Sequence, residues 1–221
     1  MAEINASMVA QLREKTGAGM MDCKKALTEN GGDFGKAEEW LRKKGISAAG
    51  KKAGRVAAEG LIGTYVHSGK IGVMVEVNCE TDFVARNPDF KALVENLAMH
   101  IAAANPTWVR RDEVPPEVVE KEKELLRAEL REQKKPEAMW EKILPGKVEK
   151  FYATNCLVDQ AYVQDDKKKV SDVVTEAVAK IGENITVRRF ARFMVGEGIE
   201  KKVDDFAAEV AAQVAAAKGG A

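Results

Sequence analysis

The side chains that could perform nucleophilic or metal chemistry are few and lie far apart in the chain. They are three cysteines and two histidines in 221 residues: Cys23, Cys79, Cys156, His67 and His100. Their spacing fits no zinc motif, so we expect no metal site and no cofactor. A Cys79 thiolate with either histidine as its base would form a nucleophilic pair. Cys79, however, falls in the inward-facing series of a predicted strand, where a thiol is usually inert.

Two glycine-rich segments match nucleotide-binding loops only in part. Segment 31–37 carries glycines and a lysine, but their spacing is wrong for a phosphate-binding loop and no Ser or Thr follows the lysine. Segment 17–22 lacks the last glycine of the dinucleotide fingerprint, and no predicted strand precedes it. We therefore predict that the protein is not an enzyme.

The segment 73–88 combines an acidic residue and a large aromatic at the joint between two predicted elements. Residues 73–79 alternate between apolar and mostly polar side chains, which predicts a strand with one buried face. The alternation stops at Glu80-Thr81-Asp82, and Asn87-Pro88 is typical of the cap and first residue of a helix. Phe83 lies on this joint, where it either packs back into the core or is exposed to a partner.

The first 55 residues predict a bundle of three short helices. Glycines at 17–19 and 31–32 separate the helices, and we expect the third to end at Lys44-Gly45. The adjacent Met20 and Met21 allow two interpretations. One methionine packs inside and the other is incidentally exposed, or both form an adaptable contact surface for a partner helix. Small and basic residues from 47 to 55 predict a linker and a domain boundary.

The rest of the chain predicts an α+β core with a projecting helical hairpin. Strand 61–66 should pair with the strand from Ile71 through a turn at 67–70, and the helix after Pro88 should pack on the sheet. Residues 115–154 have a narrow apolar seam between charged flanks, which predicts an antiparallel helical hairpin and makes dimerisation through it plausible. Pro145-Gly146 should bend or interrupt its second arm.

The carboxy-terminal third predicts a mixture of strands and helices. We expect a short strand at 160–163, a solvated loop at 164–169, a helix at 170–181, a strand at 185–195 and a last helix at 204–216. In the strand at 185–195 alternation predicts that four residues face inward, namely Val187, Ala191, Phe193 and Val195.

Composition bounds the partners that the protein can have. The 35 basic and 35 acidic residues cancel, so no net field favours nucleic acid or an anionic membrane. No apolar run is long enough to span a membrane. An odd number of distant cysteines indicates free thiols in a reducing cytosol.

A rival interpretation is a scaffold that binds nucleic acid. Its basic arm would be formed by Lys43, Lys44, Lys51, Lys52 and Arg55. It predicts salt-dependent binding of RNA, although aromatic residues for stacking on bases are scarce.

Two long motifs resemble signatures of the translation elongation factor Ts family. Segment 12–27, Leu-Arg-Glu-Lys-Thr-Gly-Ala-Gly-Met-Met-Asp-Cys-Lys-Lys-Ala-Leu, resembles the amino-terminal signature of that family. Segment 76–85, Glu-Val-Asn-Cys-Glu-Thr-Asp-Phe-Val-Ala, resembles its second signature. Segments 181–185 and 195–199 are also similar to the family, and the likeness runs from Ala2 to about Ala211.

The resemblance implies a guanine-nucleotide exchange factor that promotes release of GDP from elongation factor Tu, so that GTP can bind during chain elongation. An amino-terminal bundle of the ubiquitin-associated type would dock on the partner's GTPase domain. The residues that match the family's contacts are Arg13, Met20 and Met21 for docking; Thr81, Asp82, Phe83 and Val84 for a wedge near the partner's magnesium site; His67 for its phosphate-binding loop; and Phe206 for a carboxy-terminal contact.

The same resemblance implies three domains and a dimer. They are a ubiquitin-associated-like domain at 1–55, an α/β dimerisation core at 56–200 that contains the hairpin, and a carboxy-terminal helical module at 201–221. Longer relatives duplicate the core, whereas this chain has one, so it is similar to short members that dimerise into a two-plus-two complex with the partner. We expect a bacterial cytoplasmic protein, or a processed organellar form, that contacts neither membrane nor nucleic acid directly.

Overall fold

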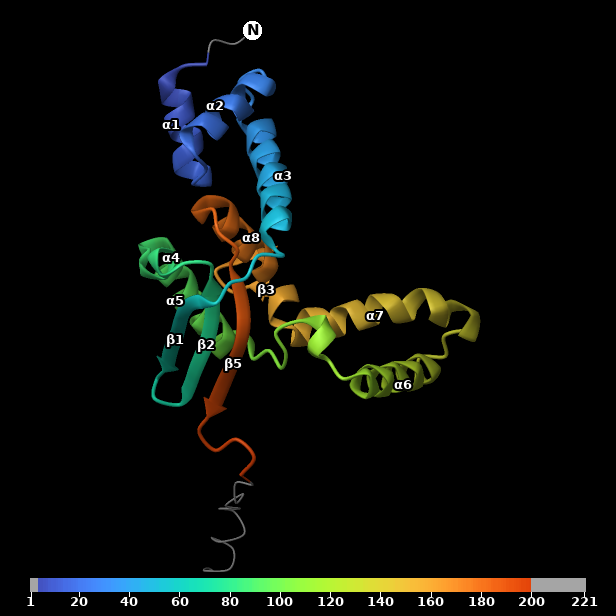
Figure 1. Cartoon of the computed structure of the whole chain (residues 1–221). Helices are drawn as coiled ribbons and strands as arrows, with labels where there is room; N and C mark the ends of the chain where they lie inside the picture. Colours follow the sequence, from blue (N-terminus) through green and yellow to red (C-terminus); the bar gives the residue numbers. More distant parts are fainter. Residues whose placement is uncertain (1–3, 200–221) are drawn as a thin grey trace, which may run out of the picture.

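The computed structural model describes residues 4–199, and its amino-terminal part consists of three helices (Figure 1). They are α1 (Ala6–Thr16), α2 (Met20–Glu29) and α3 (Phe34–Lys52). Asn5 caps α1 by accepting the backbone N–H of Met8 at 2.9 Å, as its position predicts. The helices share a small separate core, built from Val9, Leu12, Cys23, Ala26, Leu27 and Ala37.

Helix α3 is longer than the sequence predicts. The predicted end at Lys44-Gly45 is wrong, because the helix continues to Lys52 through most of the predicted linker. Gly45 does not terminate the helix; it allows close packing on α8 (Val170–Ile181). A Cβ at Gly45 would lie 3.1 Å from the Cβ of Ala179. The domain boundary near residue 55 stays a prediction.

The central sheet has three antiparallel strands in the order β1 (Glu59–His67), β2 (Ile71–Cys79) and β5 (Thr186–Met194). Ser68 and Gly69 have φ values of 50° and 65°, which suits the tight turn between two twisted strands. Helix α5 (Pro88–Ala104) packs on one face of the sheet. The main core lies between them and includes Val73, Val75, Val77, Phe90, Leu97 and Ile101.

Strand β5 contains a bulge that reverses the predicted faces of its second half. Val77 pairs with Val187 but Glu76 pairs with Arg189, so Arg188 is an extra residue on this strand. One extra residue turns every later side chain to the other face. The prediction that Ala191, Phe193 and Val195 face inward is therefore wrong: all three are exposed, Phe193 by 70%. Val187, which precedes the bulge, is buried as predicted.

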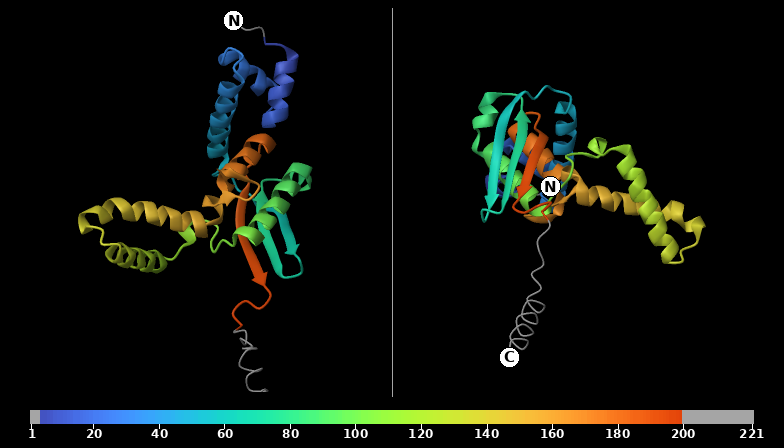
Figure 2. Two further views of the ribbon diagram at one scale, coloured as in Figure 1. Left: turned by 180° about the vertical axis from the view of Figure 1, so that it is seen from behind. Right: turned by 90° about the horizontal axis from the view of Figure 1, so that it is seen from below.

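The predicted helical hairpin is present and projects sideways from the sheet (Figures 1 and 2). Helix α6 (Pro116–Glu132) packs against α7 (Trp140–Asn155), and short 3-10 turns precede each of them at Arg111–Glu113 and Glu137–Met139. Helix α7 continues through Pro145, so the predicted interruption there is not seen. Pro145 lies inside the helix and has no N–H to donate, so α7 continues with one backbone hydrogen bond fewer.

A two-stranded ribbon and helix α8 connect the hairpin to β5. After a 3-10 turn at Leu157–Asp159, strand β3 (Ala161–Tyr162) pairs with β4 (Asp165–Lys169). The prediction of a loop at 164–169 is therefore wrong, because backbone pairing forms this strand without an apolar pattern.

Two further observations bound the fold. Phe206 and the predicted module at 201–221 lie outside the described residues. Within residues 4–199, no helix combines the length and apolarity needed to cross a membrane.

Candidate functional site

Phe83 is exposed at the start of a short helix, α4 (Asp82–Arg86), directly after β2. Its side chain is 80% exposed, whereas Val84 and Ala85 are buried in the main core. Phe83 therefore does not pack back into the core, and its contact with a partner stays a prediction. Thr81 caps this helix by accepting the backbone N–H of Val84 at 3.4 Å.

Asp82 is also exposed and lies beside Phe83. Its carboxylate accepts a hydrogen bond from the Arg86 guanidinium at 2.9 Å, one helical turn later. The first turn of α4 therefore presents an aromatic ring and a carboxylate together.

Cys79 packs beneath this turn, and both histidines are hydrogen-bonded to other residues. The thiol is fully buried and donates to the backbone oxygen of Thr81 at 3.2 Å. Burial raises the pKa of the Cys79 thiol to about 11. The imidazole of His100 is bonded instead to Gln160 and to the backbone N–H of Val163, and burial lowers its pKa.

His67 does not join Phe83. It is the last residue of β1, pairs with Ile71, and is bonded to Tyr65 at 3.1 Å between the phenol oxygen and Nδ1. Cys79 lies eight residue steps after Ile71 along β2, which corresponds to about 26 Å of strand. The two predicted contacts therefore lie at opposite ends of the sheet in one copy of the chain.

The predicted docking residues gather at the amino end of α2. Met20 is 55% exposed and Met21 76%, so the interpretation that one of them packs inside is wrong. Arg13 and Met20 share a surface groove, whose other lining residues are Ala10, Glu14, Gly17 and Lys180. Lys180 belongs to α8, so this groove joins the amino-terminal helices to the core.

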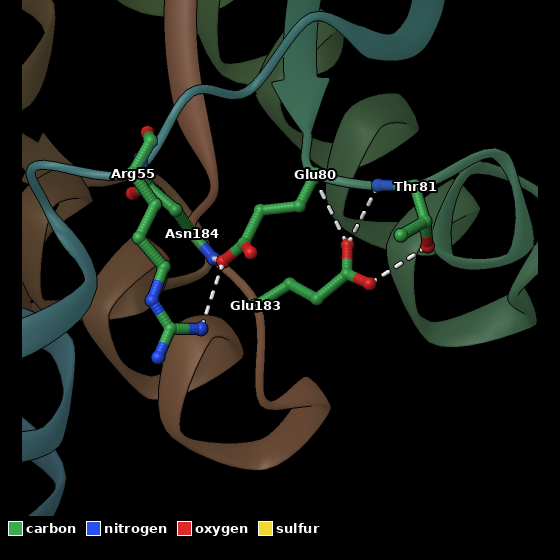
Figure 3. Close-up of polar contacts among 5 residues, drawn as sticks. All are labelled: Arg55, Glu80, Thr81, Glu183 and Asn184. Carbon is green, nitrogen blue, oxygen red and sulfur yellow. Dashed lines mark hydrogen bonds and ion pairs between the residues drawn. The ribbon is translucent and has the colours of Figure 1, made fainter.

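A residue that the sequence analysis did not single out holds the segment before α4. The carboxylate of Glu183 accepts the backbone N–H groups of Glu80 and Thr81, each at 3.0 Å, and the hydroxyl of Thr81 at 2.7 Å (Figure 3). Glu183 lies in the loop between α8 and β5. Glu183 directly follows Gly182, which ends α8, but this position only weakly predicts a role for its carboxylate. No nearby residue in the sequence indicates that Glu183 binds Glu80 and Thr81.

Three of the five cations in the basic arm of the rival interpretation pair with carboxylates: Lys43 with Glu39, Lys44 with Asp22, and Arg55 with Glu80. Exposed ion pairs of this kind are weak, so RNA binding by this arm stays a prediction. Among residues 4–199, no group of three His, Cys, Asp or Glu side chains is arranged to hold a metal ion.

Comparison with known proteins assigns the chain to a family. The family model described as "Elongation factor TS" matches residues 49–197, and the one described as "Elongation factor Ts, mitochondrial, N-terminal" matches residues 1–50. The chain is 68% identical to elongation factor Ts of Myxococcus xanthus over 211 residues, which cover 96% of this chain and 97% of that protein.

Relatives from other organisms agree. Identity is 62% over 210 residues to elongation factor Ts of Geobacter metallireducens, with 95% of this chain and 97% of the relative covered. The identity to elongation factor Ts of Desulforamulus reducens is 59% over 217 residues, which cover 98% of this chain and 100% of the relative. This chain belongs to the elongation factor Ts family.

Proposed function

We propose that this protein is the guanine-nucleotide exchange factor for elongation factor Tu. It promotes release of GDP so that GTP can bind during polypeptide elongation, and it makes and breaks no covalent bond itself. The observation that carries the proposal is Phe83, an aromatic side chain held 80% exposed on a short helix within a family of translation factors. We propose that the protein acts in the cytoplasm.

Exchange of this kind is a binding problem. The factor must bind the nucleotide-free partner better than the GDP-bound partner, and by linkage bound GDP must weaken the factor's own binding equally. An exposed phenylalanine can supply apolar burial that is available only when partner helices separate. The Asp82 carboxylate beside it can disturb the hydration of a magnesium ion.

Docking is assigned to the amino-terminal helices. We propose that they form a bundle of the ubiquitin-associated type, which contacts the partner's GTPase domain through Arg13, Met20 and Met21. Two adjacent exposed methionines support this role, because methionine is an adaptable contact residue. Helices α1 and α4 lie on the same side of the molecule, opposite the hairpin, so one partner can reach both (Figures 1 and 2).

The test is stopped-flow release of fluorescent GDP from elongation factor Tu, with and without the protein. The wild-type protein should accelerate release. Phe83→Ala should slow release by roughly thirtyfold, because burial of a phenylalanine contributes about 2 kcal/mol. Leu125→Ala is the control, since Leu125 is 59% exposed on the distant hairpin. Absence of acceleration by the wild type would refute the function, and equal rates for wild type and Phe83→Ala would refute the wedge.

We also propose that two copies associate through the sheet face opposite α5, giving a two-plus-two complex with the partner. Gly63 faces α5, so the side chains on either side of it point to the other face. The large apolar side chains on that face are all more than half exposed: Ile62, Val66, Met74 and Phe193. A face of this kind can be covered by a second identical face.

A further inference from the structure

Hydrogen bonds and an ion pair from two carboxylates hold the segment before Phe83 against two distant parts of the chain. Glu183 accepts hydrogen bonds from Glu80 and Thr81, which are more than 100 residues away in sequence. Glu80 in turn accepts the backbone N–H of Asn184 at 2.6 Å and pairs with Arg55 at 3.5 Å (Figure 3). The Glu183 carboxylate thus binds the segment that contains Glu80, and the Glu80 carboxylate binds the segment that contains Glu183.

Glu183 satisfies backbone groups for which neither β2 nor α4 provides a partner. The N–H groups of Glu80 and Thr81 lie between the end of the strand and the start of the helix, and such groups need a partner when they are shielded from water. Bonds from backbone N–H to a carboxylate are stronger than neutral ones. One carboxylate oxygen therefore fixes two successive peptide units before Phe83.

The same carboxylate orients the cap of α4. The Thr81 hydroxyl donates to Glu183 at 2.7 Å, which directs an oxygen lone pair of that hydroxyl toward the backbone N–H of Val84. Helix α4 has only five residues and starts at this cap. The direction of Phe83 therefore depends on a contact with the loop after α8.

Helix α8 connects this contact to the predicted docking surface. Lys180 lines the groove that contains Arg13 and Met20, and its ammonium group pairs with Asp89 at 3.0 Å. Gly182 then ends α8 with a φ of 94°, and Glu183 follows directly. The end of one helix thus contacts the docking helices and holds the exposed aromatic.

We propose that Glu183 is a positioning residue for nucleotide exchange: its carboxylate holds Thr81 so that Phe83 is aimed at the partner before contact. This inference rests on the proposed function. A side chain that is already held in its binding geometry loses less conformational entropy on association. A small misplacement of such a group can lower the rate of the step that it promotes. Glu183 itself touches only its own chain.

The test measures GDP release from elongation factor Tu as a function of factor concentration. Glu183→Ala should lower the maximal rate on the order of tenfold, and should change the half-saturating concentration by less than about twofold, since the docking helices are intact. Glu183→Gln should restore most of the rate, because its amide oxygen can accept both N–H groups and its amide N–H can donate to the Thr81 hydroxyl, which can still accept from Val84. Glu183→Asp is one methylene shorter and should not.

Two controls separate positioning from general loss of stability. Glu113→Ala removes a comparable bond, in which the backbone N–H of Val109 donates to the Glu113 carboxylate at 2.9 Å in the segment before α6, and it should leave the maximal rate unchanged. In the Phe83→Ala background, Glu183→Ala should have little further effect, because both changes act through one side chain. Amide hydrogen exchange should show that the backbone N–H of Thr81 loses protection in Glu183→Ala but not in Glu113→Ala.

The outcomes are distinct. If the wild type fails to accelerate GDP release, the proposed function is wrong and the positioning role falls with it. If the wild type is active and Glu183→Ala is equally fast, only the positioning role is wrong. Equal slowing by Glu113→Ala, or multiplicative effects of Phe83→Ala and Glu183→Ala, would also overturn it. If Glu183→Ala does not fold, the difference between Glu183→Gln and Glu183→Asp decides.

Discussion

At the scale of single residues, Thr81 decides which side chains of its segment reach solvent. As the cap of α4 it starts a helix at Asp82, so that Phe83 is exposed while Val84 and Ala85 are buried. A continued strand would alternate buried and exposed side chains instead. The aromatic is therefore exposed on the helix that Thr81 caps, and Glu183 accepts the hydroxyl of that cap.

The thiol of Cys79 should be unreactive in the folded protein. Burial raises its pKa to about 11, so at pH 8 the thiolate fraction is on the order of one in a thousand. Alkylation with iodoacetamide, followed by mass spectrometry, should label Cys79 only after unfolding in guanidinium. Cys156 is the internal control, because it is also buried with a pKa raised to about 11. Rapid labelling of native Cys79 would contradict the buried position.

At the scale of elements, close approach between a helix and its neighbour recurs at glycines. Gly45 lets α3 approach α8, and Gly63 lets α5 approach β1. Both glycines lie inside regular elements, where a glycine otherwise costs stability. Here the missing side chain is what allows α3 to pack on α8 and α5 to pack on the sheet.

Gly63→Ala should destabilise the fold. The new Cβ would lie 2.4 Å from Cγ1 of Val94, and Val94 is itself buried, so α5 must move away from β1. We expect a loss of about 1–3 kcal/mol in the free energy of unfolding, measured by chemical denaturation. Gly72→Ala is the control in the neighbouring strand, since nothing lies within 4 Å of its Cβ position. Equal stability of the two variants would contradict the close packing at Gly63.

At the scale of the whole molecule, the chain separates three surfaces. The amino-terminal helices and α4 lie on one side, the helical hairpin projects to the other, and the sheet keeps one apolar face without a covering helix in the described residues (Figures 1 and 2). This separation supports a partner on one side and a second copy on the sheet.

The dimer proposal predicts which variant becomes a monomer. Phe193→Glu places a charge on the exposed sheet face, near the end of the edge strand β5, and burial of an unpaired charge in an interface is costly. Sedimentation velocity should give twice the chain mass for the wild type and the single mass for Phe193→Glu. Leu125→Glu tests the alternative of dimerisation through the hairpin and should remain dimeric. Loss of the dimer in Leu125→Glu but not in Phe193→Glu would refute the sheet interface.

Most helices and strands were predictable because their signals are local. Asn87 caps α5 as expected, and alternation identified β2 with Cys79 on the buried side. The motifs at 12–27 and 76–85 also identified the family by themselves. The roles of Arg13, Met20, Met21, His67 and Phe83 toward a partner stay predictions.

Only the tertiary structure decided the features that join distant segments. Helix α3 continues past Gly45 because α8 covers it, and the faces of β5 reverse at Arg188 because of its pairing with β2. Glu183 binds Thr81, which is 102 positions away in the sequence. Phe83 is exposed on the helix that begins directly after Thr81. Sequence periodicity reports the environment within one element, whereas these outcomes depend on which elements meet.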